Sequence, residues 1–144
     1  MGASPNSSGG FALIFPQRLI RSPTAFSIGG SRRRPRIEDR KHLYFIRRLP
    51  CVVCGTRRNV EAAHVRMGSA FYGKRAAGMA EKADDKWATS LCPRHHDEQH
   101  SMNEAAFWSA LGIDPLQLAL LLFDSSGDED RAEQIIASYR EIRP

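Results

Sequence analysis

The 144-residue sequence contains only three cysteines, an odd number that excludes a framework built from paired disulfides. Two of them, Cys51 and Cys54, are separated by two residues, and the third is Cys92. In a chain so poor in cysteine, Cys-x-x-Cys is typical of metal binding or of redox chemistry in a reducing compartment. We therefore expect an intracellular protein located in the cytoplasm.

Long hydrophobic runs are also missing. No apolar stretch reaches the ~18–20 residues needed to cross a bilayer. Residues 1–10 lack the basic start of a secretory signal, and Asn6 occupies the position where a myristoylation signal has Ser or Thr. The sequence therefore predicts a soluble protein without a membrane partner.

Acidic residues are scarce in the first third of the chain. Residues 1–48 hold ten Arg and Lys against two acidic residues, whereas residues 101–144 hold three against eight. A basic front and an acidic back favour the binding of a polyanion at one side of the protein. The alternative is a solvated tail in which the arginines have no partner.

Composition and periodicity divide the chain into two parts. Residues 1–36 are rich in Ser, Gly, Pro and Arg, which predicts a disordered basic arm. Residues 37–144 are expected to form one α+β domain with a C-terminal helical extension over about 101–142. We expect helices at 37–48, 94–100, 104–111, 116–123 and 130–142, strands within 59–66 and 87–91, and a long loop at 68–86.

Four residues have the spacing of a structural zinc site. Cys51 and Cys54 form one pair with two intervening residues, and Cys92 and His95 form another. Two such pairs supply the four tetrahedral ligands that zinc requires. The alternative is buried free cysteines with a redox Cys-x-x-Cys, but that motif belongs in a βαβ context that the sequence lacks.

Three further histidines are candidates for chemistry. Neighbouring helical residues point about 100° apart, so His95 and His96 do not readily serve one ion. His96 and His100 are four residues apart on one helical face and are able to chelate a second metal, unless they are simply a solvent-facing pair. His64 ends the first strand beside Arg66, although a lone histidine is more often structural than catalytic.

The order of these motifs resembles the HNH (ββα-metal) endonuclease superfamily. Cys-x-x-Cys precedes a strand with Ala63-His64-Val65, and a second strand precedes Leu-Cys-x-x-His-His-x-x-x-His. The resemblance is strongest to the phage-type RecA-dependent nuclease (Ref-like) group and covers roughly residues 37–123. Its further motifs are residues 60–66, Gly78-Met79, Lys82, residues 84–87, residues 91–100, Phe107-Trp108 and residues 112–115.

The resemblance implies a small zinc-stapled ββα-metal (HNH) core flanked by helices and a metal-dependent hydrolysis of phosphodiester bonds in DNA. It makes His64 the general base that activates water. It makes His96 and His100 ligands of a catalytic Mg²⁺, Mn²⁺ or Zn²⁺. It implies DNA as a partner, together with a RecA-type recombinase filament as an additional candidate partner, and it agrees with a structural zinc on Cys51, Cys54, Cys92 and His95.

Two positions depart from the family pattern. Many HNH enzymes carry a metal-binding His or Asp directly before the general base, where this chain has Ala63. The Asn that orients the general base also has no counterpart at its usual distance before Cys92. We expect Asp85, ahead of Asp84, to orient His64 or to complete the metal shell.

The loop between the two motif halves is basic. Arg66, Lys74, Arg75, Lys82 and Lys86 are expected to line the nucleic-acid path, with Arg66 nearest the scissile phosphate. Such contacts carry no sequence code. An ordinary solvated loop is the alternative, and two other functions stay open: a zinc-knuckle nucleic-acid-binding module without catalysis, and a protein-interaction module that docks through its acidic C-terminal part.

Overall fold

The computed structural model describes residues 34–78 and 81–142. The chain divides into two compact units, Met1–Pro35 and Arg36–Pro144, and all that follows concerns the second. Except for its last three residues, the predicted arm at 1–36 lies outside the described residues.

Within the described residues the fold is α+β, with five α-helices and one two-stranded sheet, which confirms the predicted class. The elements are α2 (Arg40–Arg47), β1 (Glu61–His64), the 3-10 helix η2 (Asp85–Trp87), β2 (Ala88–Leu91), α3 (Pro93–Ser101), α4 (Glu104–Leu111), α5 (Pro115–Asp124) and α6 (Glu129–Glu141). Strand, loop, strand and helix follow one another as the sequence predicts. Of the residues between β1 and η2, those that the structure describes contain no helix or long strand.

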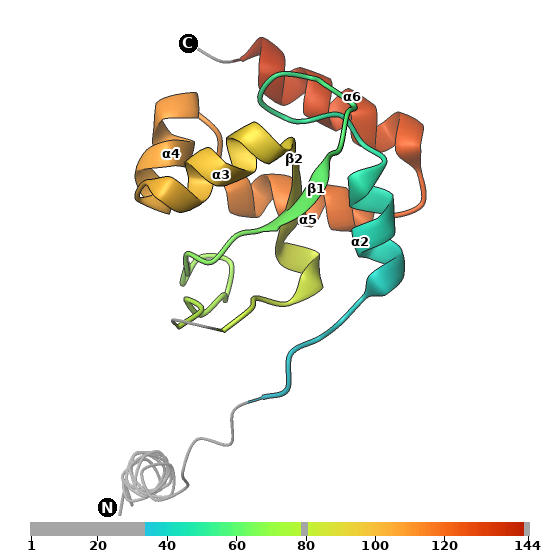
Figure 1. The fold of residues 1–144 in the computed structure, drawn as a ribbon. Helices are drawn as coiled ribbons and strands as arrows, with labels where there is room; N and C mark the ends of the chain where they lie inside the picture. The colour runs from blue at the N-terminus through green and yellow to red at the C-terminus, as the bar shows by residue number, and fades with distance from the viewer. Residues whose placement is uncertain (1–33, 79–80, 143–144) are drawn as a thin grey trace, which may run out of the picture. The chain divides into compact units, whose positions relative to one another are not determined.

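The two strands form an antiparallel pair in which Glu61 lies opposite Leu91 and His64 opposite Ala88. Every residue of β2 is buried, whereas in β1 only Ala63 is buried, Glu61 is exposed and the other two residues are half-buried. In Figure 1 the pair crosses the centre of this unit, with α2 to its right, α3 and α4 to its left and α5 behind. The sheet therefore brings residues from both motif halves to the start of α3.

Short polar caps and glycine set the ends of the C-terminal helices. The Asn103 side chain accepts a hydrogen bond from the N–H of Ala106 at the start of α4, and Gly112 ends that helix with a φ of 65°. Asp114 caps α5, in which Pro115 occupies the first turn. These are the residues from which the helix ends were predicted.

The start of α2 differs from the prediction of a helix from residue 37. Asp39 is the N-cap, and residues 36–39 run in a non-helical conformation. The N–H of Asp85 donates to Ile37 O at 3.1 Å, and the N–H of Ile37 donates to an Asp84 carboxylate oxygen at 2.8 Å. The helix begins late because this segment pairs with residues 83–85 instead.

The core consists of two clusters that α5 joins. Leu118 and Leu122 pack into the larger cluster beneath the sheet, and Leu116 and Ala119 pack into the smaller one with Trp87. α5 is therefore the buried helix, as its composition predicts. Of the predicted stripe on α6, Ile136 is buried, and Ile135 and Tyr139 pack against the larger cluster while partly exposed.

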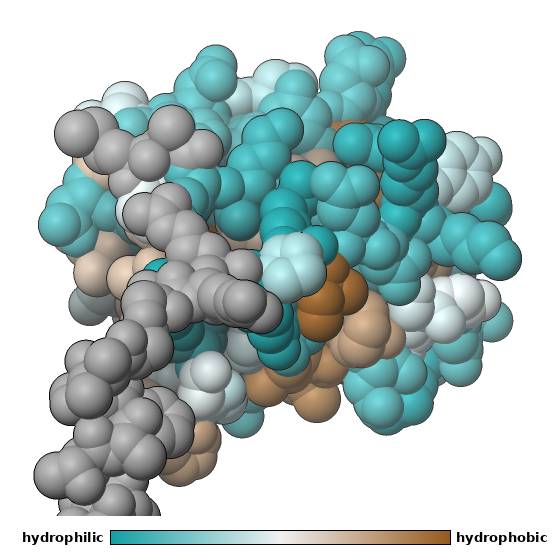
Figure 2. Space-filling model, turned by 90° about the horizontal axis from the view of Figure 1, so that it is seen from below, coloured by the Kyte–Doolittle hydropathy of each residue, from teal (hydrophilic) through white to brown (hydrophobic). Residues whose placement is uncertain are grey.

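The face shown in Figure 2 is mainly hydrophilic, with hydrophobic side chains gathered between its centre and its lower edge. Among the described residues, no single helix has both the length and the apolar character to cross a membrane. One bent pair, α4 with α5, passes the same test of length and composition.

Candidate metal centre and histidine sites

Cys51, Cys54, Cys92 and His95 come together in one group. Their ligand atoms all lie within 4.8 Å of one another, and this is the one group of three or more potential ligands found among the described residues. Cys51 Sγ lies 3.6 Å from His95 Nδ1, and Cys54 Sγ lies 3.8 Å from Cys92 Sγ. The structure thus assembles the four residues that the spacing predicts as a metal site.

These separations fit a zinc tetrahedron. Zinc bonds of about 2.3 Å to sulfur and about 2.0–2.1 Å to nitrogen place neighbouring ligand atoms about 3.5–3.8 Å apart. The Cys51–His95 and Cys54–Cys92 distances fall in that range, and only the Cys92–His95 distance of 3.1 Å is shorter. Three thiols and one imidazole are a donor set that zinc prefers, so the residues fit a structural zinc ion.

Backbone hydrogen bonds shape the turn that carries the first two ligands. The N–H of Gly55 donates to Cys51 O at 2.8 Å, and Gly55 has a φ of 75°, which favours glycine. The N–H of Val52 donates to Ser90 O of β2 at 3.0 Å. β2 leads directly into Cys92, so this one bond ties the first pair of ligands to the second.

Burial makes the site unfavourable for a bare thiolate. It raises the pKa of Cys51 to about 11, so this sulfur keeps its proton unless a cation replaces it. Binding of a divalent metal here would release that proton, as it does in other thiolate sites.

His64 and Asp85 lie close together at the end of the sheet where β1 finishes and β2 begins. Nε2 of His64 lies 2.8 Å from Oδ1 of Asp85, in the geometry of a hydrogen-bonded pair. His64 ends β1, and Asp85 opens η2, directly before β2 pairs with β1. The structure therefore brings together the two residues that the sequence nominated as base and orienting partner.

Asp85 is buried and held by two further donors. The N–H of Asp39 donates to Oδ2 at 2.7 Å, and the Arg36 guanidinium donates to Oδ1. Burial alone would raise the pKa of Asp85, but the hydrogen bonds from Asp39, His64 and Arg36 hold it below its ordinary value. Asp85 is thus a carboxylate at neutral pH.

His64 is kept neutral by its surroundings. Burial lowers the pKa of His64 below its ordinary value, and the Asp85 carboxylate offsets only part of that effect. Among the described residues no group is hydrogen-bonded to its Nδ1. A neutral ring that donates from Nε2 to Asp85 therefore has an unprotonated Nδ1 available to accept a proton.

His96 and His100 form a second histidine site on α3. Their Nε2 atoms lie 3.0 Å apart, and Nδ1 of His96 lies 2.5 Å from Oε2 of Glu61 on β1. Within residues 34–78 and 81–142, no hydrogen bond or ion pair joins this pair to His64. Glu61 and His64 are three residues apart on β1, so their side chains leave opposite faces of the strand.

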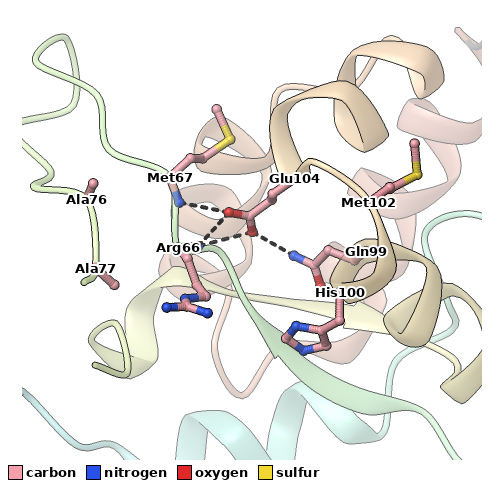
Figure 3. Close-up of a pocket in the computed structure, with 8 residues that line it drawn as sticks. All are labelled: Arg66, Met67, Ala76, Ala77, Gln99, His100, Met102 and Glu104. Carbon is pink, nitrogen blue, oxygen red and sulfur yellow. Dashed lines mark hydrogen bonds between the residues drawn. The ribbon is translucent and has the colours of Figure 1, made fainter. Parts of the chain in front are cut away.

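A pocket opens beside His100. It has a volume of about 320 Å³ and is lined by Arg66, Met67, Ala76, Ala77, Gln99, His100, Met102 and Glu104. In Figure 3 the Arg66 and His100 side chains lie below the Glu104 carboxylate, which dashed lines join to neighbouring residues. Glu104 accepts from the N–H of Arg66 and of Met67 and from Nε2 of Gln99.

The five predicted phosphate-binding cations have different surroundings. Nζ of Lys74 is turned to the carbonyl of Met67 at 2.8 Å, and the side chain is buried. Arg75 pairs with Glu81 at 3.4 Å, and Nζ of Lys86 lies 5.0 Å above the Trp87 ring. Lys82 is exposed. Lys74 therefore stabilises the loop backbone in this structure and offers no free ammonium.

Arg66, the fifth of these cations, lies in the pocket wall beside His100. Its guanidinium donates to the carbonyl of Gly78 at 2.7 Å. This one bond leaves other guanidinium N–H groups to contact a ligand.

Three contributors to these sites were not singled out by the sequence analysis: Arg36, Glu61 and Glu104. Arg36 was assigned to the disordered arm, yet it contacts both Asp85 and the carbonyl of Ala83. The sequence carried one signal for Glu61, because this residue shares a strand face with Ala63, the position where many HNH enzymes carry a metal ligand. Glu104 had none, since an acidic residue in a first helical turn is already explained by the helix dipole.

Comparison with known proteins gives one match. Residues 22–127 match the model of a family described as "Protein of unknown function (DUF968)". No curated protein and no solved structure matches the chain. The matched segment contains every candidate ligand and the His64–Asp85 pair, and it spans well over half of the 144 residues. The chain therefore belongs to the DUF968 family of proteins of unknown function.

Proposed function

We propose that the protein is a metal-dependent endonuclease of the HNH type that hydrolyses phosphodiester bonds in DNA. The observation that carries the proposal is the 2.8 Å contact between His64 Nε2 and Asp85 Oδ1. It supplies an orienting partner for the histidine that the HNH resemblance makes the general base. That partner is an aspartate in place of the family's asparagine.

In this proposal, His64 takes the proton of the water that attacks the phosphodiester. Asp85 accepts from Nε2–H, which fixes the tautomer and leaves the lone pair on Nδ1 for that proton. Asp85 also stabilises the imidazolium that forms, because it stays charged. The lowered pKa of His64 keeps the ring in its basic form at neutral pH.

His96 and His100 are the residues that would hold the catalytic divalent ion. Their two Nε2 atoms approach to 3.0 Å, which is consistent with two lone pairs directed at one ion. When bound, such an ion supplies charge stabilisation for the phosphate and for the leaving oxygen. Arg66 lines the same pocket as His100 and is suited to bind a neighbouring phosphate.

The structural zinc has a separate part in this proposal. Cys92 and His95 occupy the N-cap and the first turn of α3, directly before His96. A zinc ion on these residues and on the Cys51–Cys54 turn would fix the start of α3 against β2. The ion thereby holds the metal-binding face of α3 in place without taking part in the reaction.

One observation favours a second candidate, a zinc-knuckle nucleic-acid-binding module without catalysis. Among the described residues, His96 and His100 have no third ligand close enough to form a group of three with them. The strand position where many HNH enzymes add that ligand is Ala63, which is fully buried. A phosphate and water from substrate and solvent have to complete the coordination if the protein is a nuclease.

The two candidates are separated by a cleavage assay with zinc-loaded protein. Supercoiled plasmid and single-stranded DNA are incubated with Mg²⁺, Mn²⁺ or added Zn²⁺, with and without a RecA-type filament on the DNA. A nuclease converts at least one substrate, and His96→Ala abolishes the conversion, whereas the exposed control Asp97→Asn on the same helix does not. Salt-sensitive DNA binding with no cleavage under any of these conditions would support the non-catalytic module.

A further inference from the structure

Glu61 contacts His96, and this contact takes no part in the reaction proposed above. Oε2 of Glu61 lies 2.5 Å from Nδ1 of His96 and thereby joins β1 to α3. The other ring nitrogen of His96, Nε2, lies 3.0 Å from Nε2 of His100. The two rings are tilted by 43° with centroids 4.7 Å apart, so they are not simply stacked.

The carboxylate decides which nitrogen of His96 carries the proton. An ionised carboxylate only accepts hydrogen bonds, so a neutral His96 must have its proton on Nδ1. Its Nε2 is then an unprotonated lone pair that points at His100. An imidazole binds a metal through such a lone pair, and metal-binding histidines regularly donate their other N–H to a carboxylate.

We propose that Glu61 is a positioning residue for a divalent cation site on His96 and His100. It acts through His96, whose tautomer and ring orientation it fixes, and it does not itself contact the ion. The inference rests on the proposed function only in taking this pair as the metal site. Strand β1 thus contributes to the cation site through Glu61, which lies two residues before Ala63 and on the same strand face.

A role in fold stability explains the contact less well. The Glu61 side chain is 48% exposed and that of His96 21%. Even a full ion pair this close to solvent would contribute little to stability, because water screens it. Loss of Glu61 is therefore expected to change metal binding and the state of His96 while leaving the fold and the zinc content unchanged.

The test uses full-length, zinc-loaded protein labelled with ¹⁵N, as wild type and as Glu61→Ala and Glu61→Gln. Glu98→Gln is the matched control, since Glu98 is an acidic residue of α3 that pairs with Arg94 and not with histidine. Long-range ¹H–¹⁵N spectra of the imidazoles, recorded at alkaline pH without added metal, report the tautomer of each ring. Titration with Co²⁺, measured by calorimetry, then reports binding in addition to the zinc.

We expect His96 to be protonated on Nδ1 in the wild type and in Glu98→Gln, and to lose that preference in Glu61→Ala. Co²⁺ affinity should fall about 10- to 100-fold in Glu61→Ala. The loss should be smaller in Glu61→Gln, whose amide oxygen still accepts from Nδ1–H. Zinc content and melting temperature should be the same in all four proteins.

Two results would overturn the inference: wild-type His96 protonated on Nε2, or equal Co²⁺ affinity in the wild type and Glu61→Ala. A wild type that binds no Co²⁺ beyond its zinc would also overturn the inference, whereas the cleavage assay decides the proposed function separately. If Co²⁺ binding follows the expected pattern and no DNA is cleaved, the proposed function fails and the inference stands.

Discussion

At the scale of single residues, the Asp85 carboxylate is shared among three donors. Oδ1 accepts from the Arg36 guanidinium and lies beside His64 Nε2, and Oδ2 accepts from the N–H of Asp39. A buried carboxylate with this many partners is fixed in one orientation, since any rotation would break several hydrogen bonds. His64 is thereby held in one orientation and one tautomer as well.

The pH dependence of cleavage tests the link between these two residues. The Asp85 carboxylate raises the pKa of His64 against the effect of burial. Asp85→Asn removes that charge, so the pKa of His64 falls. The acidic limb of the kcat/KM profile should move to lower pH, and the maximal rate should drop because the ring is no longer oriented. An acidic limb at the wild-type pH in Asp85→Asn would show that another group governs it.

Two lysines between β1 and η2 give a second prediction at the scale of residues. Lys82 is exposed, whereas Lys74 is buried against backbone carbonyls. Lys82→Ala should weaken DNA binding at low salt and lower the slope of log affinity against log salt by about one. Lys74→Ala should instead lower the melting temperature. Fluorescence anisotropy and thermal unfolding measure the two effects, and an exchange of these phenotypes would contradict the assignment.

At the scale of elements, sequence patterns predicted the pieces whose signals are local. Asn103, Gly112 and Asp114-Pro115 mark helix ends by their own side chains or backbone, and the structure confirms them. The start of α2 was placed too early, because Arg36 is bonded to a residue 47 positions away. No local pattern reveals a pairing at that distance.

The candidate site likewise contains residues that local patterns predict and contacts between distant residues that they do not. The four candidate metal ligands and the His96–His100 pair follow from spacing within short segments, and their assembly required only that the strands pair. Asp85 was predicted from its position in the HNH-like pattern of motifs. The contact between Glu61 and His96 joins residues 35 positions apart, and its geometry depends on how α3 packs on β1.

Glu104 connects three elements and predicts a stability effect. Its carboxylate at the start of α4 accepts from two N–H groups at the exit of β1 and from Gln99 of α3. Glu104→Ala should lower the free energy of unfolding by about 2 kcal/mol, measured by urea denaturation. Glu98→Ala removes only an exposed pair with Arg94 and should change it by less than about 0.5 kcal/mol. Equal effects would contradict the role of Glu104.

At the scale of the whole molecule, the candidate metal-binding group connects segments that are far apart in the sequence. Cys51 and Cys54 follow α2, and Cys92 and His95 begin α3. The larger core cluster lies around the same residues and includes Cys51 and Cys92 themselves. Loss of the metal therefore affects the contact between α2, the sheet and α3 together.

Removal of zinc should unfold the protein. Structural zinc contributes about 10–16 kcal/mol of apparent free energy in small domains, which equals or exceeds most of the range of about 5–15 kcal/mol that their net stability covers. Cys92→Ser, or a strong chelator added to the wild type, should abolish the cooperative melting transition seen by circular dichroism, and added Zn²⁺ should restore the chelated wild type. An unchanged melting curve after verified zinc loss would contradict a structural site.

The most direct test of the proposed function is the single-turnover rate of DNA cleavage by zinc-loaded wild type and by His64→Ala. The assay uses Mn²⁺ and a substrate that the wild type converts, with circular dichroism to show that the variant is folded. Loss of a general base should slow cleavage about 10²- to 10⁴-fold. Equal rates in the two proteins, or a wild type that cleaves no DNA substrate, would contradict the proposed function.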